Sequence, residues 1–386
     1  MIAEVVSWLI FGFLSLGVLG FNFVLRRKAS RKPWRLRMEE DFGMKTSIIV
    51  PTYNESNVIA FKLRNLSIQE YPKELAEIIV VDSKSDDGTV EIVRSFAKEH
   101  PEMKIEVLEE NERKGKSAAL NAALKHCSGD IIVISDADCF WPSDLLHRAL
   151  PFLSDPGVGA VSGPKILLNA ESSGVAKGES RYLDSMNLVK LGESKTGSTL
   201  LFEGGFSAYK KEVLDSFDPY HTGSDDCGTV ISLVEKNSRA ILVSEARFYT
   251  TFPNHFVEKL SMKIRRATQL IRVFWKYLFL LLNGRIKNNG NIIAVNILIY
   301  LFAPVFFMIF LAITILLFIS YPWLIASALI FLVPGIGSYL SEAFQGFLVL
   351  FSGIWAVVLR RNFLVWNKPA DRYLFSEELL AKHNLV

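Results

Sequence analysis

Two long apolar segments at opposite ends of the chain set the strongest limit on how this sequence can fold. Residues 2–25 include a single charged side chain, Glu4, and residues 291–359 also include only one, Glu342. A helix needs about 20 apolar residues to cross the hydrocarbon core of a bilayer. A soluble core rarely needs an apolar run as long as the second. The sequence therefore predicts one transmembrane helix over residues 1–25 and further transmembrane helices over residues 291–359.

Basic residues beside these segments indicate their orientation. Residues 26–37 contain seven lysines and arginines and no acid. A signal peptide carries its positive charge before its apolar run, whereas here the charge follows it, so we expect a retained anchor. By the positive-inside rule, residues 26–44 form a basic cytoplasmic linker. Arg360 and Arg361 follow the last apolar segment, which predicts a cytoplasmic tail over residues 360–386 and an even number of C-terminal crossings.

The overall charge is nearly balanced. Lysine and arginine total 43 and aspartate and glutamate total 40, which gives a formal net charge of +3. Nucleic-acid-binding proteins normally show a concentrated basic field, so no nucleic-acid partner is expected. The three cysteines do not pair off and lack the spacing of a metal site. We expect buried, reduced thiols at Cys127, Cys139 and Cys227.

Between the apolar ends, residues 45–252 alternate strand-like and helical patterns. Short apolar runs such as "TSIIVPT", "AEIIVVD", "KIEVLEE" and "DIIVIS" are separated by helical segments. This alternation predicts an α/β domain whose mainly parallel sheet carries helices on both faces. The polar clusters "PTYNE", "DSKSDDGT" and "SDAD" follow three of these runs. Because ligands of such sheets bind at the carboxyl ends of the strands, the clusters predict one shared site.

Two carboxylates, Asp136 and Asp138, close the fourth predicted strand. In a straight strand their side chains point to opposite faces, so both can serve one site only if the chain turns at Ala137. Mg²⁺ prefers oxygen ligands and typically takes one or two carboxylates together with substrate phosphates. The chain lacks both the phosphate-loop motif of ATPases and GTPases and the Gly-x-Gly-x-x-Gly motif of dehydrogenases, which disfavours these two classes.

Four successive motifs carry a resemblance to a known family. "IIVPTYNE", "VVDSKSDDGT", "RKGKSAALNAAL" and "GDIIVISDAD" resemble the family 2 inverting glycosyltransferases, which have the GT-A nucleotide-sugar fold, and the match runs roughly from Lys45 to Trp275. The resemblance implies that Asp82 binds the nucleobase and that Asp136 and Asp138 hold the diphosphate through Mn²⁺ or Mg²⁺. It also implies that the nucleoside pocket is lined by Pro51, Thr52, Tyr53, Asn54, Glu55 and Lys116.

The acceptor side is expected in two later segments. "HTGSDDCGTV" resembles the family's paired-acid motif, whose second acid is the general base, so Asp226 is the expected base and Asp225 orients it or the acceptor. The alternative reading of these acids is that they favour the dipole at a helix N-terminus. "LFEGGFSAY" resembles the acceptor-side loop, in which glycine lets the backbone approach the sugar. It supplies Glu203, Gly204 and Gly205, and Glu203 is expected either to contact the donor sugar or to be a solvated loop acid.

Residues 253–290 predict amphipathic helices at the membrane interface. They contain Gln269 and Arg272, which resemble the Gln-x-x-Arg-Trp motif of membrane-bound members, with Val273 at the tryptophan position. By resemblance, Arg272 stabilises the leaving diphosphate. After the last apolar segment, "VWNKPADRYLF" resembles the tail of lipid-glycosylating members and adds two substrate-binding candidates, Trp366 and Arg372.

The resemblance predicts a multi-pass hexosyltransferase of the cell membrane with a cytoplasmic catalytic domain. It would move a sugar from a nucleotide donor, with UDP as the expected nucleotide, to a lipid or lipid-linked acceptor. Two alternatives stay open. A processive synthase of the cellulose or hyaluronan type is disfavoured by the few C-terminal spans and by Val273. A non-catalytic nucleotide-sugar-binding protein is disfavoured by the candidate base Asp226. The motifs do not specify the sugar, the acceptor or the oligomeric state.

Overall fold

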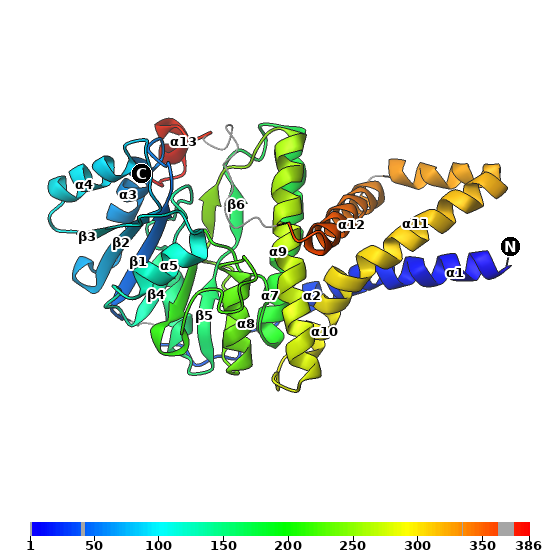
Figure 1. The fold of residues 1–386 in the computed structure, drawn as a ribbon, viewed down its shortest axis with the longest axis horizontal. Coiled ribbons are helices and arrows are strands. Elements are labelled where there is room, and N and C mark those ends of the chain that lie inside the picture. Colours follow the sequence, from blue (N-terminus) through cyan, green and yellow to red (C-terminus); the bar gives the residue numbers. More distant parts are fainter. Residues whose placement is uncertain (1, 40–42, 334, 362–373) are drawn as a thin grey trace.

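The computed structural model describes residues 2–39, 43–333, 335–361 and 374–386, and shows an α/β domain from which apolar helices project on one side (Figure 1). A seven-stranded sheet with the order β3-β2-β1-β4-β7-β5-β8 forms the centre of the domain, and a two-stranded sheet, β6-β9, lies beside it. The strands are β1 Thr46–Thr52, β2 Ala76–Asp82, β3 Lys104–Glu109, β4 Ile131–Ile134, β5 Val158–Ser162, β6 Lys165–Leu167, β7 Ser207–Lys210, β8 Arg239–Leu242 and β9 Phe248–Thr250.

The seven-stranded sheet is parallel except at β7, which runs antiparallel to both β4 and β5. The helices of the chain are α1 Ile2–Gly12, α2 Val18–Ser30, α3 Ile59–Ser67, α4 Thr89–Glu99, α5 Lys116–Leu124, α6 Leu145–Ala149, α7 Gly174–Thr196, α8 Cys227–Glu235, α9 Phe256–Leu282, α10 Gly290–Ile297, α11 Ala303–Ser320, α12 Ile336–Val358 and α13 Glu377–Lys382. The predicted mainly parallel sheet with helices on both faces is therefore confirmed.

Both faces of the sheet are buried, which explains the continuous apolar runs of the strands. In β1, Ile49 points into one core, with helices α5, α8 and α9, while Ile48 and Val50 point into the other core, with α3, α4 and α6. Burying each such side chain stabilises the fold by about 1.5–3 kcal/mol. The register pairs Thr52 of β1 with Asp82 of β2, so the polar clusters that follow these strands meet at one edge.

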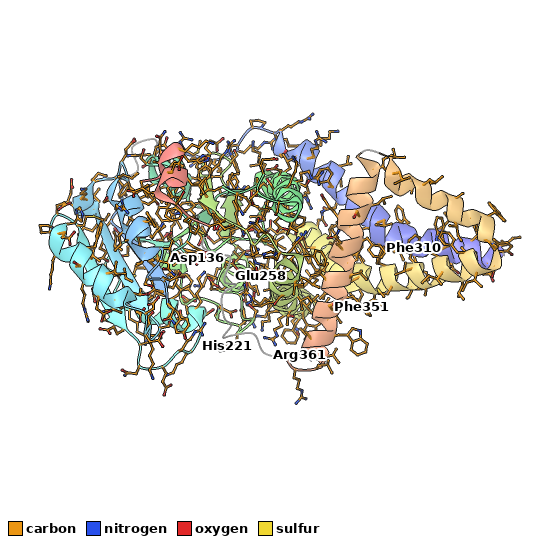
Figure 2. The ribbon with its side chains drawn as sticks, turned by 90° about the horizontal axis from the view of Figure 1, so that it is seen from above. Asp136, His221, Glu258, Phe310, Phe351 and Arg361 are labelled. Atoms are coloured by element: carbon orange, nitrogen blue, oxygen red, sulfur yellow. The ribbon has the colours of Figure 1, made fainter. Side chains whose placement is uncertain are left out.

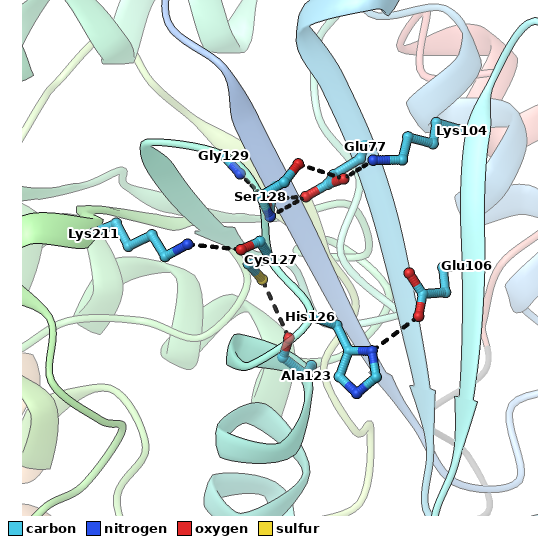
Figure 3. Close-up of polar contacts among 10 residues, drawn as sticks. Glu77, Lys104, Glu106, Ala123, His126, Cys127, Ser128, Gly129 and Lys211 are labelled. Carbon is cyan, nitrogen blue, oxygen red and sulfur yellow. Dashed lines mark hydrogen bonds and ion pairs between the residues drawn. The ribbon is translucent and has the colours of Figure 1, made fainter.

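The opposite edge of the sheet is held by one buried carboxylate, Glu77 of β2 (Figure 3). Its oxygens accept hydrogen bonds from Ser47 Oγ at 2.6 Å and from the backbone nitrogen of Ser128 at 2.6 Å, and Lys104 pairs with it. Burial alone would raise the pKa of Glu77, but Lys104, Ser47 and Ser128 lower it to about 2. These contacts hold the connection from α5 to β4 in place. They therefore fix the start of β4, the strand after which Asp136 lies.

Three helical segments among the described residues are long and apolar enough to cross a membrane: Ile2–Ser30, Gly290–Ser320 and Tyr339–Val358. The first two pack together, because Trp8 Nε1 donates to Thr314 Oγ1 at 2.8 Å. An apolar 3₁₀ segment, Pro322–Leu332, lies between α11 and α12.

The chain is also attached to the α/β domain on either side of these spans. At its C-terminal end α2 lies against α7 so closely that a Cβ at Gly192 would stand 2.1 Å from the carbonyl oxygen of Arg26. After α12, the C-terminal segment packs on α3, with Leu380 and Leu385 fully buried. Both attachments place the flanks of the apolar helices on the side of the domain.

Candidate active site

One large cleft of about 1790 Å³ opens at the carboxyl edge of the sheet. It extends from the residues after β1 and β4, past the loop before α8, to the side of α12. Figure 2 labels one lining residue from each part: Asp136, His221 and Phe351. The cleft thus joins the strand ends of the α/β domain to a candidate membrane span.

Asp136 and Asp138 lie where the chain leaves β4, and the chain turns at Ala137 as the sequence requires. The backbone nitrogen of Cys139 donates to the carbonyl oxygen of Asp136 at 3.1 Å and closes the turn. As a result, one ligand atom from each of Asp136, Asp138 and Cys139 lies within 4.8 Å of the others. Two carboxylates at this spacing suit a hard divalent cation, whereas the thiol of Cys139 suits softer metals.

Lys116, the first residue of α5, connects the two sides of the cleft. Its Nζ lies 2.7 Å from Asp136 Oδ1 and 2.7 Å from Asp225 Oδ2. Burial lowers the pKa of Lys116, but the charges of Asp136 and Asp225 raise it above its usual value. Gly204 leaves the space for this link, because a Cβ there would stand 2.5 Å from Lys116 Nζ and 3.2 Å from Asp136 Oδ2.

The expected nucleoside side of the cleft is lined by Pro51, Thr52, Tyr53 and Glu55. The guanidinium carbon of Arg113 lies 3.6 Å from the centre of the Tyr53 ring, and Arg113 also lines the cleft. Asp82 is 1% exposed and does not line it. Its carboxylate accepts from Thr52 Oγ1 at 2.9 Å and from the backbone nitrogen of Ser85 at 2.8 Å. In this structure Asp82 therefore holds the loops after β1 and β2 together.

Glu203 lies between two buried lysines. Its carboxylate is 3.0 Å from Lys165 Nζ and 2.7 Å from Lys190 Nζ. Burial alone would raise the pKa of Glu203, but the charges of Lys165, Lys190 and Arg266 lower it well below its usual value. The acid therefore stays ionised beside Gly204, and the solvated-loop reading of Glu203 does not hold.

Asp225 and Asp226 lie side by side in the sequence but have different surroundings. Asp226 caps α8, since its Oδ1 accepts from the backbone nitrogen of Cys227 at 2.6 Å and from Ser224 Oγ at 2.5 Å. Burial raises the pKa of Asp225 to about 6, against the lowering effect of Lys116. Both acids line the cleft, so the capping role and a catalytic role are compatible.

Gln269 and Arg272 line the cleft from α9, which is one continuous helix. Gln269 Nε2 donates to the carbonyl oxygen of Gly223 at 2.5 Å, and Arg272 Nη2 donates to that of Arg361 at 2.8 Å. Val273 is fully buried, so the position where the motif has tryptophan faces the core. The two tail candidates, Trp366 and Arg372, fall outside the described residues.

Known proteins with a similar sequence or fold bear on this site. The sequence profile described as "Glycosyl transferase family 2" matches residues 47–217, the segment that contains the turn at Asp136 and Asp138. Over this segment the chain is similar to members of this family. A mannosyltransferase from Pyrobaculum calidifontis, solved with GDP-Man and Mn²⁺, has the same fold: the TM-score is 0.80 at 29% identity, over 92% of this chain and 99% of the other.

Two curated relatives give further comparisons for this chain. A beta-monoglucosyldiacylglycerol synthase from Trichormus variabilis is 32% identical over 44% of this chain, and the chain spans only 36% of that enzyme's length. A poly-beta-1,6-N-acetyl-D-glucosamine synthase from Staphylococcus epidermidis is 26% identical over 74% of this chain and 76% of its own length.

Several lining residues were not predicted. Lys165, Lys190 and Arg113 carry charges into the cleft, but in sequence each lies in an ordinary polar context. The only available signal was indirect. A carboxylate such as Glu203 beside Gly-Gly needs a cationic partner when it is buried, yet nothing in the sequence says which lysine provides it.

Proposed function

We propose that this protein is a membrane-bound inverting glycosyltransferase of family 2 that transfers a sugar from a nucleotide-sugar donor to a lipid or lipid-linked acceptor. One observation carries the proposal: a single cleft is lined at one end by Asp136 and Asp138 and at the other by α12, a candidate membrane span. Such a cleft suits a reaction between a soluble phosphorylated donor and an acceptor anchored in the bilayer. The similarity to a diacylglycerol glycosyltransferase agrees with it.

On the donor side, Asp136 and Asp138 would hold Mn²⁺ or Mg²⁺, which neutralises charge on the leaving diphosphate when bound. The similarity to a mannosyltransferase solved with Mn²⁺ supports this choice of metal. Lys116 holds Asp136 in place. Arg272 lines the cleft from α9, and its positive charge would stabilise the negative charge of the leaving diphosphate. Tyr53 and Arg113 offer a flat surface for the nucleobase.

On the acceptor side, Asp226 is proposed as the general base that removes the proton from the attacking hydroxyl group. Its Oδ1 is fixed by the backbone of Cys227 and by Ser224, which orients the carboxylate. Asp225 lies beside it and holds Lys116. Attack from the side opposite the diphosphate then inverts the anomeric carbon, and Glu203 beside Gly204 contacts the donor sugar.

The proposed donor is a nucleoside diphosphate sugar. The two observations that bear on its nucleobase point to different bases. The motif resemblance favours uridine, whereas the similar mannosyltransferase binds GDP-Man. A processive synthase is the second candidate, because the similarity to a poly-N-acetylglucosamine synthase covers 74% of this chain. The two candidates differ in their products, a glycolipid or a polymer.

The deciding experiment incubates detergent-purified protein with membrane lipid extract, Mn²⁺ and radiolabelled GDP-mannose, UDP-glucose or UDP-N-acetylglucosamine. We expect label in the organic phase, lost with EDTA and lost with Asp226→Asn while donor binding persists. The matched control is Asp215→Asn, an exposed acid outside the cleft that is paired with Lys236.

Each other outcome has a defined meaning. Label in a high-mass aqueous polymer would replace the glycolipid proposal with the synthase. If Asp226→Asn transferred sugar at the wild-type rate, its role as base would be excluded. If no donor were turned over by folded protein with metal, the proposed activity itself would fail.

A further inference from the structure

We propose that the C-terminal segment, residues 374–386, is a positioning element of the donor site and holds the Asp136–Asp138 turn in place through α3. The proposal rests on the proposed function, because it assumes that this turn binds the metal and the diphosphate. The segment follows the last candidate span in the chain, yet it packs beside α3 of the α/β domain (Figure 1) and does not line the cleft.

The first step of the argument is the contact between α3 and the residues that follow the turn. Lys62 is fully buried, and its Nζ donates to the carbonyl oxygen of Cys139 at 2.8 Å and lies 4.1 Å from the centre of the Trp141 ring. Asn65, one turn further along α3 and also fully buried, accepts from the backbone nitrogen of Trp141 at 2.9 Å. Helix α3 thus holds the backbone of residues 139–141 in place by hydrogen bonds.

The second step is that the C-terminal segment completes the hydrogen bonding of Asn65. The Asn65 Nδ2 group donates to the carbonyl oxygen of Trp141 at 2.8 Å and to that of Leu385 at 2.6 Å. Both amide hydrogens and the amide oxygen are therefore used, and the orientation of the side chain is determined. Without Leu385, one buried hydrogen-bond donor would lose its partner, which favours a different arrangement of this amide.

The third step is that the segment packs directly on Phe140, two residues after Asp138, and on Tyr249 of β9. The Phe375 ring meets the Phe140 ring edge-on at 5.0 Å, and His383 lies beside Tyr249 at 5.9 Å. Phe140 and Tyr249 exchange two backbone hydrogen bonds of 2.8 Å. The next residue of β9, Thr250, donates from its hydroxyl group to the carbonyl oxygen of Asp138 at 2.9 Å.

The fourth step connects this support to the glycine loop of the cleft. Trp141 Nε1 donates to the carbonyl oxygen of Gly205 at 2.9 Å, and the backbone nitrogen of Asp136 donates to that of Gly204 at 3.3 Å. A shift of Trp141 would therefore move the metal-binding turn and the loop that faces the donor sugar together. Groups that orient metal ligands in this way typically change metal affinity by about 10–100-fold when they are removed.

The test measures the affinity of the purified protein for GDP and for UDP in the presence of Mn²⁺, by titration calorimetry without sugar or acceptor. Two variants are compared with the wild type: a chain that ends at residue 373, and Asn65→Ala. We expect affinity to fall by about tenfold or more in both variants. In transfer assays the donor KM should rise more than kcat falls.

Arg64→Ala is the matched control, because Arg64 lies on the same helix and its side chain makes an exposed ion pair to Glu377 of the same segment and a ring contact with Phe61, neither of which touches the turn. We expect it to bind nucleotide as the wild type does. Addition of a synthetic peptide of residues 374–386 to the shortened chain should restore part of the affinity. A purely structural role would lower the unfolding temperature of the variants without changing nucleotide affinity.

The outcomes separate this proposal from the proposed function. If the wild type bound neither nucleotide with Mn²⁺, the proposed function would fail first. If the wild type bound one and Asn65→Ala bound it equally well, the positioning role would be overturned. If the shortened chain did not fold, Phe375→Ala would decide the question, because it keeps the segment and removes its ring contact with Phe140, and unchanged nucleotide affinity of this variant would overturn the positioning role.

Discussion

Lys116 is the residue through which the two sides of the cleft influence each other. It lies between an acid of the proposed metal site, Asp136, and an acid of the proposed acceptor site, Asp225. An ammonium group shared by two carboxylates fixes the separation of the two groups that would act on donor and acceptor. Its position depends on the absence of a side chain at Gly204.

Gly204→Ala should therefore impair the reaction without unfolding the protein. The new methyl group would collide with the end of the flexible Lys116 side chain, which can move away at little cost to the fold. A 1 Å displacement in an active site can cost about 100-fold in rate, so we expect kcat/KM to fall by about 10–100-fold. Steady-state transfer kinetics and the unfolding temperature measure the two effects.

Gly290→Ala provides the control for this substitution. Gly290 begins α10, and a Cβ there would meet nothing within 4 Å. We expect both activity and unfolding temperature to stay at the wild-type values. Equal activity of Gly204→Ala and Gly290→Ala would show that the Lys116 link is not needed for transfer.

Some residues in and around the candidate site could be predicted from the local sequence, and others could not. Asp136 and Asp138 were predictable because a charged pair directly after a buried strand is costly unless it binds something. Lys62, by contrast, was not predictable. It lies in the helical pattern of α3, where a lysine ordinarily faces solvent, and its burial arises from packing against Trp141. Contacts between distant segments leave no local pattern.

At the scale of elements, β1, β2 and β4 were predictable from continuous apolar runs, because both of their faces are buried, whereas the edge strand β3 alternates charged and apolar residues and has no fully buried residue. The antiparallel strand β7 was not, since "SAYK" has no distinct pattern and its direction is set by pairing with β4 and β5. The position of β4 itself depends on Glu77 at the opposite edge of the sheet (Figure 3). This element-level support can be tested by stability.

Glu77→Gln should destabilise the domain at neutral pH. The substitution removes the charge that Lys104 and the Ser128 backbone contact, and an imperfectly satisfied buried group costs about 1–3 kcal/mol. Because the folded-state pKa of Glu77 is lowered to about 2, its ionised form stabilises the fold above the ordinary value of 4.5. We expect the difference in unfolding temperature from wild type to shrink as the pH falls from 4.5 toward 2.

Glu106→Gln is the control for this prediction, because Glu106 is a half-exposed acid on β3 whose contact is His126. An exposed ion pair of this kind contributes about 0–1 kcal/mol to the free energy of unfolding. The unfolding temperature of Glu106→Gln should therefore remain close to that of the wild type. A difference for Glu77→Gln that stayed constant between pH 7 and pH 3 would contradict the assignment of the stabilisation to the ionised carboxylate.

At the scale of the whole molecule, the attachments on either side of the candidate spans limit how many times the chain could cross the bilayer of the proposed membrane enzyme. The end of α2 lies on α7, and the C-terminal segment lies on α3, so both flanks belong to the side of the α/β domain. If α11 leaves this side, α12 must return to it. On the proposed topology, the hydrogen bond from Trp8 to Thr314 would place α1 and α11 side by side in the bilayer.

This topology predicts which positions an impermeant maleimide reaches in intact cells. The three native cysteines are at most 5% exposed, so they contribute little background. We expect Ala3→Cys and Ser320→Cys to react from outside, and Glu112→Cys and Lys382→Cys to react only after the membrane is permeabilised. Reaction of Lys382→Cys from outside would contradict the docking of the C-terminal segment on the domain. Reaction of Ser320→Cys only after permeabilisation would instead show that α11 does not cross, so that α12 cannot be its return.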